Sequence, residues 1–230
     1  MAHIPTGLEC IDKSLGGGIN PATITLVYGE PETGKSTLML HLAVNCALQN
    51  SKVLYVDCDN TFSTKRLYQI AGRNFEAVAE RIVLVKPTDF REQTALIDRI
   101  EDYTVNVGLI IIDTFTSLYS ARAAESPKTF SFNRELNRQL AVLAQTVKTK
   151  KIPLVMTSQV RSVISDQASS VRPVATRVLK FWADSILFLK PADLPQTIKA
   201  TVEKAPQQSG GPLVCYIQIG EAGIRDTQLP

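Results

Sequence analysis

Short apolar runs recur along the chain at a spacing that is typical of strands buried on both faces. They cover residues 23–28, 53–57, 82–85, 109–113, 153–158 and 185–189. Helical patterns lie between them: Leu136, Leu140, Leu143 and Val147 step by four, three and four and so share one helical face. Residues 96–100 repeat this pattern. Strands that alternate with helices predict an α/β fold with a mostly parallel central sheet flanked by helices.

The pattern changes beyond Pro191. Residues 197–203 and 213–219 alternate apolar and polar positions, and the sequence Ser-Gly-Gly-Pro at 209–212 separates them. This arrangement predicts an antiparallel hairpin that closes the edge of the sheet. The stretch 161–174 is rich in Ser, Gln and Val and joins a strand to a helix, so we expect a long functional or mobile loop there.

The composition is that of an ordinary globular protein, with 230 residues, 44% of them hydrophobic and 20% charged. This length suits one α/β domain over residues 1–230 and leaves no room for a second full domain. The N-terminus does not read as a signal peptide, and no stretch is apolar over the length that a bilayer requires. We therefore expect a cytoplasmic protein without a membrane partner.

The four cysteines are Cys10, Cys46, Cys58 and Cys215, and they lie far apart in the sequence. They form no C-x-x-C pair, and with only two histidines in the chain they give no structural zinc signature. We expect all four to be buried free thiols in a reducing compartment.

The run G-E-P-E-T-G-K-S at residues 29–36 fits the phosphate-binding loop pattern G-x-x-x-x-G-K-[ST] at every fixed position. A β-branched, apolar run precedes it and an apolar helical segment follows, which is the context that the motif requires. Such a loop holds phosphates with backbone N–H groups at the start of a helix. Lys35 would reach the β and γ phosphates, and the Ser36 hydroxyl would hold Mg²⁺.

Polar side chains follow three of the predicted strands. Asp113 ends a buried run, where its carboxylate would orient Mg²⁺ or a water bound to it. Asp57 and Asp59 follow another strand; one of them could polarise the attacking water, or both could cap the turn. Gln159 follows a third strand, where its amide could sense the γ-phosphate or simply be a surface residue.

Positive charge is concentrated between residues 148 and 190, where eight basic residues face two acidic ones and give a local net charge of +6. This is a footprint for a phosphate backbone or a solvated rim of Lys and Arg. Phe181 and Trp182 lie within it. They are stacking aromatics or, as we expect for most such clusters at helical spacing, part of a core-facing helix.

These motifs together resemble the RecA/RadA recombinase family, and within it the short archaeal paralogues known as RadB. The resemblance covers nearly the whole chain, because six motifs occur in the family's order. They are residues 5–19 (PTGLECIDKSLGGGI), 29–36 (GEPETGKS), 55–62 (YVDCDNTF), 113–117 (DTFTS), 157–160 (TSQV) and 223–226 (GIRD).

The resemblance implies a RecA-like P-loop ATPase core with ATP and Mg²⁺ as ligands. Ser36 and Asp113 would hold Mg²⁺, Lys35, Asp59 and Gln159 would act in hydrolysis, and Arg66 matches an arginine that lies along the adenine. The segment 161–174 matches the family's second DNA-binding loop. The ATP contacts expected are Gly29, Glu30, Pro31, Glu32, Thr33, Gly34, Lys35, Ser36, Thr37 and Arg66. The DNA contacts expected are Arg161, Arg172, Arg177 and Lys180, which would neutralise phosphates of single-stranded or double-stranded DNA.

Two departures from the family pattern bear on activity. The family has Glu where this chain has Asp59, which is one methylene shorter; because a misplaced base can cost about 100-fold in rate, we expect weak hydrolysis. The chain also starts at the core, without the N-terminal helical DNA-binding domain and linker of RadA, so we expect an accessory role rather than filament assembly by that route. Lys204 stands where RadA has an acid near the nucleotide of the neighbouring subunit.

Three functions remain open on the sequence. The first is a DNA-dependent ATPase with weak turnover that assists homologous recombination and DNA repair, together with a RadA-like recombinase. The second is an ATP-switched module that contacts a recombinase with little catalysis. The third is a KaiC-like regulatory ATPase, which we rank last because paired glutamates are typical of such domains where this chain has Asp57-Cys58-Asp59. The sequence does not choose between monomer and homodimer.

Overall fold

A nine-stranded sheet organises the part of the chain that the structure describes. The computed structural model describes residues 3–124, 129–165, 168–173, 175–206 and 211–227. In the order of the sheet, the strands are β11 (Gly223–Asp226), β10 (Leu213–Gly220), β9 (Thr197–Lys204), β8 (Ser185–Pro191), β1 (Ile24–Gly29), β5 (Leu154–Ser158), β4 (Val107–Asp113), β2 (Lys52–Asp57) and β3 (Ile82–Val85). The six strands from β8 to β3 are parallel, and β9, β10 and β11 continue the sheet by antiparallel pairing.

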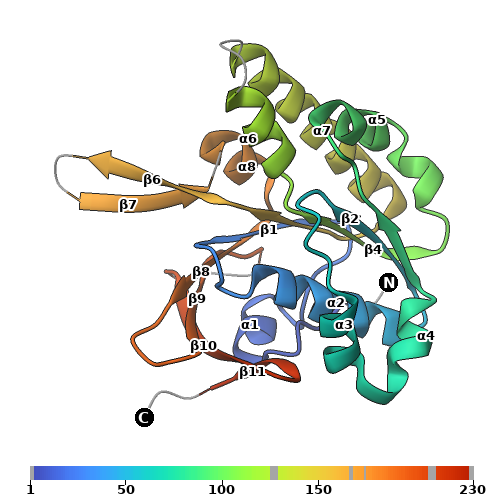
Figure 1. Cartoon of the computed structure of the whole chain (residues 1–230), viewed down its shortest axis with the longest axis vertical. Helices are drawn as coiled ribbons and strands as arrows, with labels where there is room; N and C mark the ends of the chain where they lie inside the picture. The colour runs from blue at the N-terminus through green and yellow to red at the C-terminus, as the bar shows by residue number, and fades with distance from the viewer. Residues whose placement is uncertain (1–2, 125–128, 166–167, 174, 207–210, 228–230) are drawn as a thin grey trace.

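Helices cover both faces of this sheet (Figure 1). On one face lie α1 (Glu9–Ser14), α2 (Lys35–Leu48), α3 (Thr64–Ala71) and α4 (Phe75–Ala79); on the other lie α5 (Phe90–Asp98), α6 (Ser117–Ala124), α7 (Thr129–Lys150) and α8 (Thr176–Trp182). Short 3₁₀ turns, Gly72–Asn74 and Ile100–Tyr103, follow α3 and α5. The two layers form separate apolar clusters, because alternate residues of each strand point to opposite faces. This is the predicted α/β architecture.

The hydrophobic patterns are confirmed at most of the predicted elements. Leu136, Leu140, Leu143 and Val147 of α7 are fully buried against the sheet. The run at residues 82–85 departs from expectation, because β3 is the edge strand and its middle residues are more than one third exposed. An apolar run alone does not distinguish a central strand from an edge strand.

The prediction of a long loop after β5 is wrong, because the backbone there is regular. Residues 160–165 and 168–173 form a two-stranded antiparallel ribbon, β6 (Val160–Ser165) and β7 (Ala168–Pro173), whose register pairs Arg161 with Arg172. The ribbon projects from the body of the molecule, with α8 near its base (Figure 1). Neither strand pairs with the main sheet. The side chains of both arginines lie outside the described part of the chain, as does Val174.

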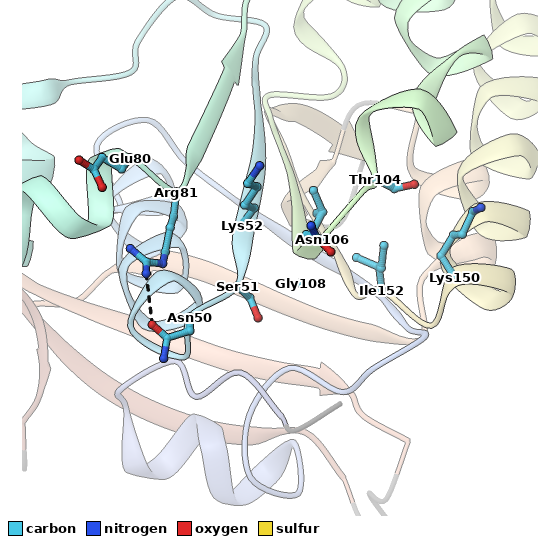
Figure 2. Close-up of a pocket in the computed structure, with 11 residues that line it drawn as sticks. Asn50, Ser51, Lys52, Glu80, Arg81, Thr104, Asn106, Gly108, Lys150 and Ile152 are labelled. Carbon is cyan, nitrogen blue, oxygen red and sulfur yellow. Dashed lines mark hydrogen bonds between the residues drawn. The ribbon is translucent and has the colours of Figure 1, made fainter.

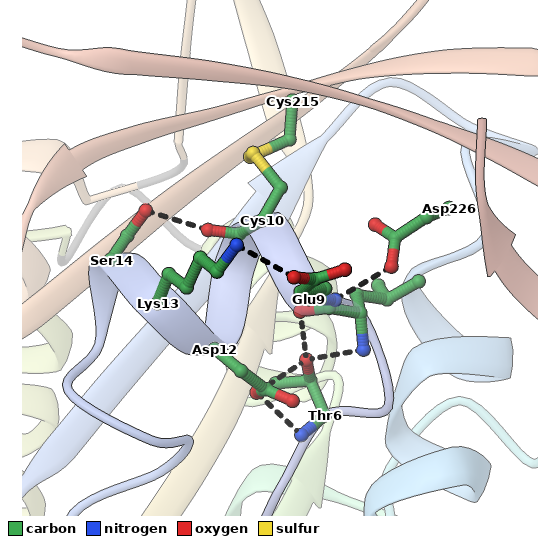
Figure 3. Close-up of a disulfide and its surroundings, with 9 residues drawn as sticks. Thr6, Glu9, Cys10, Asp12, Lys13, Ser14, Cys215 and Asp226 are labelled. Carbon is green, nitrogen blue, oxygen red and sulfur yellow. Dashed lines mark hydrogen bonds and ion pairs between the residues drawn. A yellow bond between two sulfur atoms is a disulfide. The ribbon is translucent and has the colours of Figure 1, made fainter. Parts of the chain in front are cut away.

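A disulfide corrects the expectation of four free thiols. Cys10 on α1 is bonded to Cys215 on β10, with Cα atoms 5.9 Å apart, whereas Cys46 and Cys58 are free and buried. The backbone N–H of Glu9 also donates to Asp226 Oδ2 at 2.6 Å, so the opening helix is fixed to the last strands (Figure 3). Because 205 positions separate the two cysteines, no local pattern in the sequence could reveal the pair.

We expect the double variant Cys10→Ser, Cys215→Ser to lose about 2–4 kcal/mol of unfolding free energy under non-reducing conditions, because the crosslink restricts the unfolded chain. Urea unfolding of wild type and variant would measure the difference. Added reductant is the control, since it should bring the wild type to the stability of the variant. Alkylation of four thiols in unfolded, unreduced protein would contradict the bond.

Candidate nucleotide site

The phosphate-binding loop lies between β1 and α2, as the motif requires. Gly34 adopts a left-handed conformation (φ 80°) as the N-cap of α2, which a side chain would strain. Gly29 lies so close to β8 that a Cβ would collide with the Leu189 carbonyl oxygen. Thr33 is fully buried, and its hydroxyl donates to the Glu30 carbonyl at 2.8 Å. These contacts fix the shape of the loop at the start of α2. The backbone N–H groups of the first turn of that helix are the groups that would bind a phosphate.

The side chain of Lys35 folds back onto this loop. Its ammonium donates to the carbonyl oxygens of Gly29 at 3.0 Å and Glu30 at 2.6 Å. Burial lowers the pKa of Lys35, while the carboxylates of Asp113 and Asp59 raise it. A half-buried ammonium at the start of a helix attracts a polyphosphate more strongly than an exposed lysine does.

Asp113 lies at the end of β4 and is 1% exposed. Its two carboxylate oxygens accept hydrogen bonds from Tyr55 Oη at 2.9 Å and Thr157 Oγ1 at 2.5 Å. Burial raises the pKa of Asp113, and hydrogen bonds from Thr157, Ser36 and Tyr55 oppose that shift. The hydroxyl and carboxylate oxygens of Ser36 and Asp113 are hard donors of the kind that Mg²⁺ prefers.

The two candidate bases after β2 have different environments. Both oxygens of Asp57 are used within its own turn, where they accept from the N–H groups of Thr61 and Phe62 at 3.0 Å each, and Lys86 lies 3.4 Å away. Asp57 therefore caps the turn. Asp59 instead lines the pocket beside the phosphate-binding loop.

This pocket has a volume of about 450 Å³ and unites residues from four segments of the chain. Lys35 and Ser36 come from α2, Asp59 from the turn after β2, Thr114 from the end of β4, and Gln159 from the link between β5 and β6. The remaining lining residues are Gly29, Pro31, Glu32, Thr61 and Val160. The parallel strands bring these positions together because their carboxyl ends meet at one edge of the sheet.

This chain belongs to the Rad51 family. The profile of that family matches residues 1–227. Relatives named DNA repair and recombination protein RadB include one from Methanobrevibacter smithii, 34% identical over 96% of this chain and 94% of its own, and one from Thermococcus kodakarensis, 34% identical over 98% and 100%. A crystal structure titled RadB recombinase superposes with a TM-score of 0.83 at 33% identity and covers 98% of this chain and 100% of that one. The RecA-like fold is thereby confirmed.

Arg66, which the Rad51-family motif predicts to lie along the adenine, bonds to the closing turn in this structure. Its guanidinium, on α3, donates to the carbonyl oxygens of Gly220 and Glu221 in the β10–β11 turn at 2.8 Å each. It is not among the residues that line the pocket at the phosphate-binding loop. In this structure its bonds hold the closing turn against α3, and its contact with adenine stays a prediction.

One described lysine of the basic segment in this Rad51-family chain lies far from the ribbon. Lys150, at the end of α7, lines a 750 Å³ hollow with Lys52 and Arg81 at the amino ends of the strands, and it lies 3.6 Å from Glu101 (Figure 2). The β6–β7 ribbon follows the carboxyl end of β5, at the opposite edge of the sheet. Lys150 thus lies at the end of the sheet away from the ribbon, and the phosphate footprint stays a prediction.

Lys180 and Arg177 differ in their freedom to meet a ligand. The Lys180 ammonium lies 2.7 Å from Glu203 Oε2 and 3.4 Å from the Tyr28 hydroxyl, and it also faces the Tyr28 ring. Its charge is already paired within the protein. Arg177 is exposed on α8.

The expectation of a core-facing aromatic pair is wrong for Phe181, which is 76% exposed. Trp182 packs against the core and donates its indole N–H to Asn137 Oδ1 at 2.8 Å. Leu179 of α8 is fully buried, and Phe181, two positions later, points away from that side.

His41, which the sequence did not single out, connects α2 to the closing turn. Its Nε2 accepts the backbone N–H of Ile224 at 2.8 Å, and a Cβ at Gly223 would collide with the imidazole. Next to it, the side chain of Ile219 lies where a Cβ on Gly34 would be. The helix that begins at the phosphate-binding loop is therefore packed directly on the β10–β11 turn.

We expect a pH-dependent contribution to stability from His41. Burial and then the nearby Arg66 guanidinium lower its pKa below the ordinary value of 6.5. Because protonation removes the acceptor lone pair, the contribution is complete above pH 6.5 and is lost as the pH falls through the lowered pKa. Its size is about 1 kcal/mol, that of one hydrogen bond.

Urea unfolding at several pH values between about 7.5 and 5 would test this by comparison with His41→Gln, whose amide oxygen can accept the same hydrogen bond without titrating. The wild type should lose more stability than the variant across that range. Parallel curves for the two proteins would show that His41 does not titrate there.

Proposed function

We propose that the chain binds ATP and Mg²⁺ at the phosphate-binding loop, hydrolyses ATP slowly, binds DNA, and assists homologous recombination and repair beside a RadA-like recombinase. The observation that carries the proposal is the 450 Å³ pocket that Lys35, Ser36, Asp59 and Gln159 line together, with the buried Asp113 carboxylate close to Ser36 and Lys35. Members of the RecA/Rad51 family are ATPases, and the relatives at 34% identity are named for DNA repair and recombination.

Each residue has a separate task in the proposed reaction. Lys35 neutralises charge on the terminal phosphates, and the N–H groups of the first turn of α2 orient them. Mg²⁺, held by Ser36 and oriented by Asp113, would supply further stabilisation of the developing negative charge. Asp59 orients a water molecule and accepts its proton. Gln159, the link between the pocket and β6, reports the nucleotide state to the ribbon.

The short side chain of Asp59 supports a second candidate function, an ATP-switched module with little catalysis. The Asp carboxylate reaches less far than the Glu that the family has at this position. The ATPase rate with and without single-stranded DNA separates the two functions. Stimulation by DNA favours the ATPase, and an unchanged, negligible rate with intact ATP binding favours the module.

Lys35→Ala should abolish tight ATP binding, because it removes the fixed charge that faces the phosphates. Isothermal titration with ATP and Mg²⁺ would measure the loss, which we expect to exceed about 100-fold, or about 2.7 kcal/mol. Lys65→Ala, an exposed lysine on α3, is the matched control and should bind as the wild type does. Wild-type affinity in the Lys35 variant would refute the phosphate site.

Asp59→Glu should raise turnover about tenfold, or about 1.4 kcal/mol of barrier, because the longer carboxylate reaches further toward the water. ATP affinity should hardly change, since the added interaction exists mainly in the transition state. Steady-state ATPase assays and ATP titrations would measure both quantities.

Asp59→Asn is the control for that variant and should remove the residual turnover without loss of fold. A fall in rate for the Glu variant, with unchanged affinity and stability, would mean that Asp59 is already the optimal base. No change in either variant would exclude Asp59 from the reaction.

A further inference from the structure

The disulfide between Cys10 and Cys215 borders a hollow in the surface of the molecule. Both cysteines line this hollow, whose volume is about 720 Å³. Cys215 on β10 is 2% exposed, whereas Cys10 on α1 is only half-buried and is the more accessible of the two (Figure 3). A small thiol can therefore reach the bond from solvent, and access is one of the conditions for thiol–disulfide exchange.

Strand β10 leads from the disulfide to the phosphate-binding loop. Cys215 and Ile219 are four positions apart on this strand, so their side chains point to the same face of the sheet. The side chain of Ile219 lies where a Cβ on Gly34 would be, and Gly34 is the N-cap of α2. One end of the crosslinked strand is thus tied to α1, and the other end packs on the loop that would hold phosphates.

The turn that follows β10 is attached to the same side of the molecule. The backbone N–H of Ile224 donates to His41 Nε2 on α2 at 2.8 Å, and the Arg66 guanidinium on α3 donates to the Gly220 carbonyl at 2.8 Å. Because packed elements move as units, a shift of β10 relative to α1 would also shift its contacts with Gly34 and α2.

The disulfide decides how firmly β10 is fixed to α1. The other polar link between α1 and the closing strands that the described chain shows is the hydrogen bond from the Glu9 N–H to Asp226 Oδ2, which is exposed. Water competes for an exposed hydrogen bond, so that link constrains the strands far less than a covalent bond does. The disulfide and dithiol forms therefore differ in how closely β10 is held against the phosphate-binding loop.

We propose that Cys10 and Cys215 form a redox switch for the nucleotide site, with high ATP affinity in the disulfide form and lower affinity in the dithiol form. The proposal rests on the ATP binding in the proposed function and adds its regulation. Disulfides in reducing compartments are mostly catalytic or redox-sensing, whereas those of hyperthermophiles are often structural. A purely structural crosslink is thus the alternative to the switch.

The reductant that the switch requires is a dithiol. One thiolate of the dithiol attacks Sγ of Cys10, the S–S bond breaks, and Cys215 leaves as a thiolate that takes up a proton. The second thiol of the reductant then attacks the mixed disulfide and releases Cys10 as a thiol. Two electrons pass to the protein, and the dithiol becomes a cyclic disulfide.

The first measurement is the affinity for a non-hydrolysable ATP analogue with Mg²⁺, by isothermal titration of oxidised protein and of protein reduced with dithiothreitol. Circular dichroism checks that both forms are folded. Reduction should weaken binding about fivefold, the lower end of ordinary coupling between two sites. The double variant Cys10→Ser, Cys215→Ser should bind as the reduced wild type does and should not respond to dithiothreitol, which excludes an effect through Cys46 and Cys58.

Ile219→Ala tests the route from the disulfide to the loop, because it shortens the side chain that packs on Gly34. This variant should still form the disulfide but bind the analogue equally well in both redox states. An undiminished difference between the two states would overturn the route through Gly34.

Thermodynamic linkage requires a reverse effect of equal size. Saturating analogue and Mg²⁺ should raise, by about fivefold, the ratio of reduced to oxidised dithiothreitol that reduces half of the protein. Alkylation of unfolded protein followed by mass spectrometry measures this ratio, since the oxidised chain has two free thiols, Cys46 and Cys58, and reduction adds Cys10 and Cys215. A ratio that does not depend on the analogue would overturn the switch.

Failure of the inference is distinguishable from failure of the proposed function. If oxidised and reduced protein bind the analogue equally well, the bond is a structural crosslink only, and ATP binding stands without the switch. Tighter binding by the reduced protein would also overturn the inference. If neither form binds the analogue, the proposed function is wrong and the switch with it.

Discussion

The parallel pairing of β1 with β5 on one side and β8 on the other is the interaction on which the candidate nucleotide site depends. The register sets Tyr28, the last residue before the phosphate-binding loop motif, against Ser158 and Phe188. Because β4 and β2 continue the same parallel arrangement, Asp57 and Asp113 are paired at the same edge. Segments that are distant in sequence therefore end around one pocket beside the phosphate-binding loop. The register also brings the Leu189 carbonyl against Gly29, where a side chain would not fit.

The burial of Asp113 at the carboxyl edge of the sheet costs desolvation free energy. A carboxylate at 1% exposure is unfavourable unless its oxygens are hydrogen-bonded, and Tyr55 and Thr157 provide those bonds. The nearby Lys35 ammonium adds an opposite charge. The same groups make a strong field for Mg²⁺ and phosphate, so the polar interactions that allow the burial also prepare the site for an anionic ligand.

The β10–β11 turn is fixed to the nucleotide side of the molecule by several independent contacts. His41 holds Ile224 from α2, Arg66 holds the carbonyls of the turn from α3, and the disulfide connects β10 to α1. Ile219 packs against the glycine that caps α2. The closing strands thus help to hold the phosphate-binding loop in place. A movement of that loop would also move the β10–β11 turn that packs against it.

The sequence by itself predicted most of the strands and helices and the position of the candidate nucleotide site. Periodicity predicted the buried strands and the α7 stripe, and the motif placed Lys35 and Ser36 at the start of a helix, because both signals depend on residues close together in the chain. Only the tertiary structure decided which of Asp57 and Asp59 faces the pocket, how Cys10 meets Cys215, and that Phe181 points outward. These outcomes depend on neighbours that are brought together by strand pairing over long sequence separations, and no local pattern records them. For the same reason the ribbon at β6–β7 was expected as a loop: its two strands gain their pairing from each other and not from the apolar core.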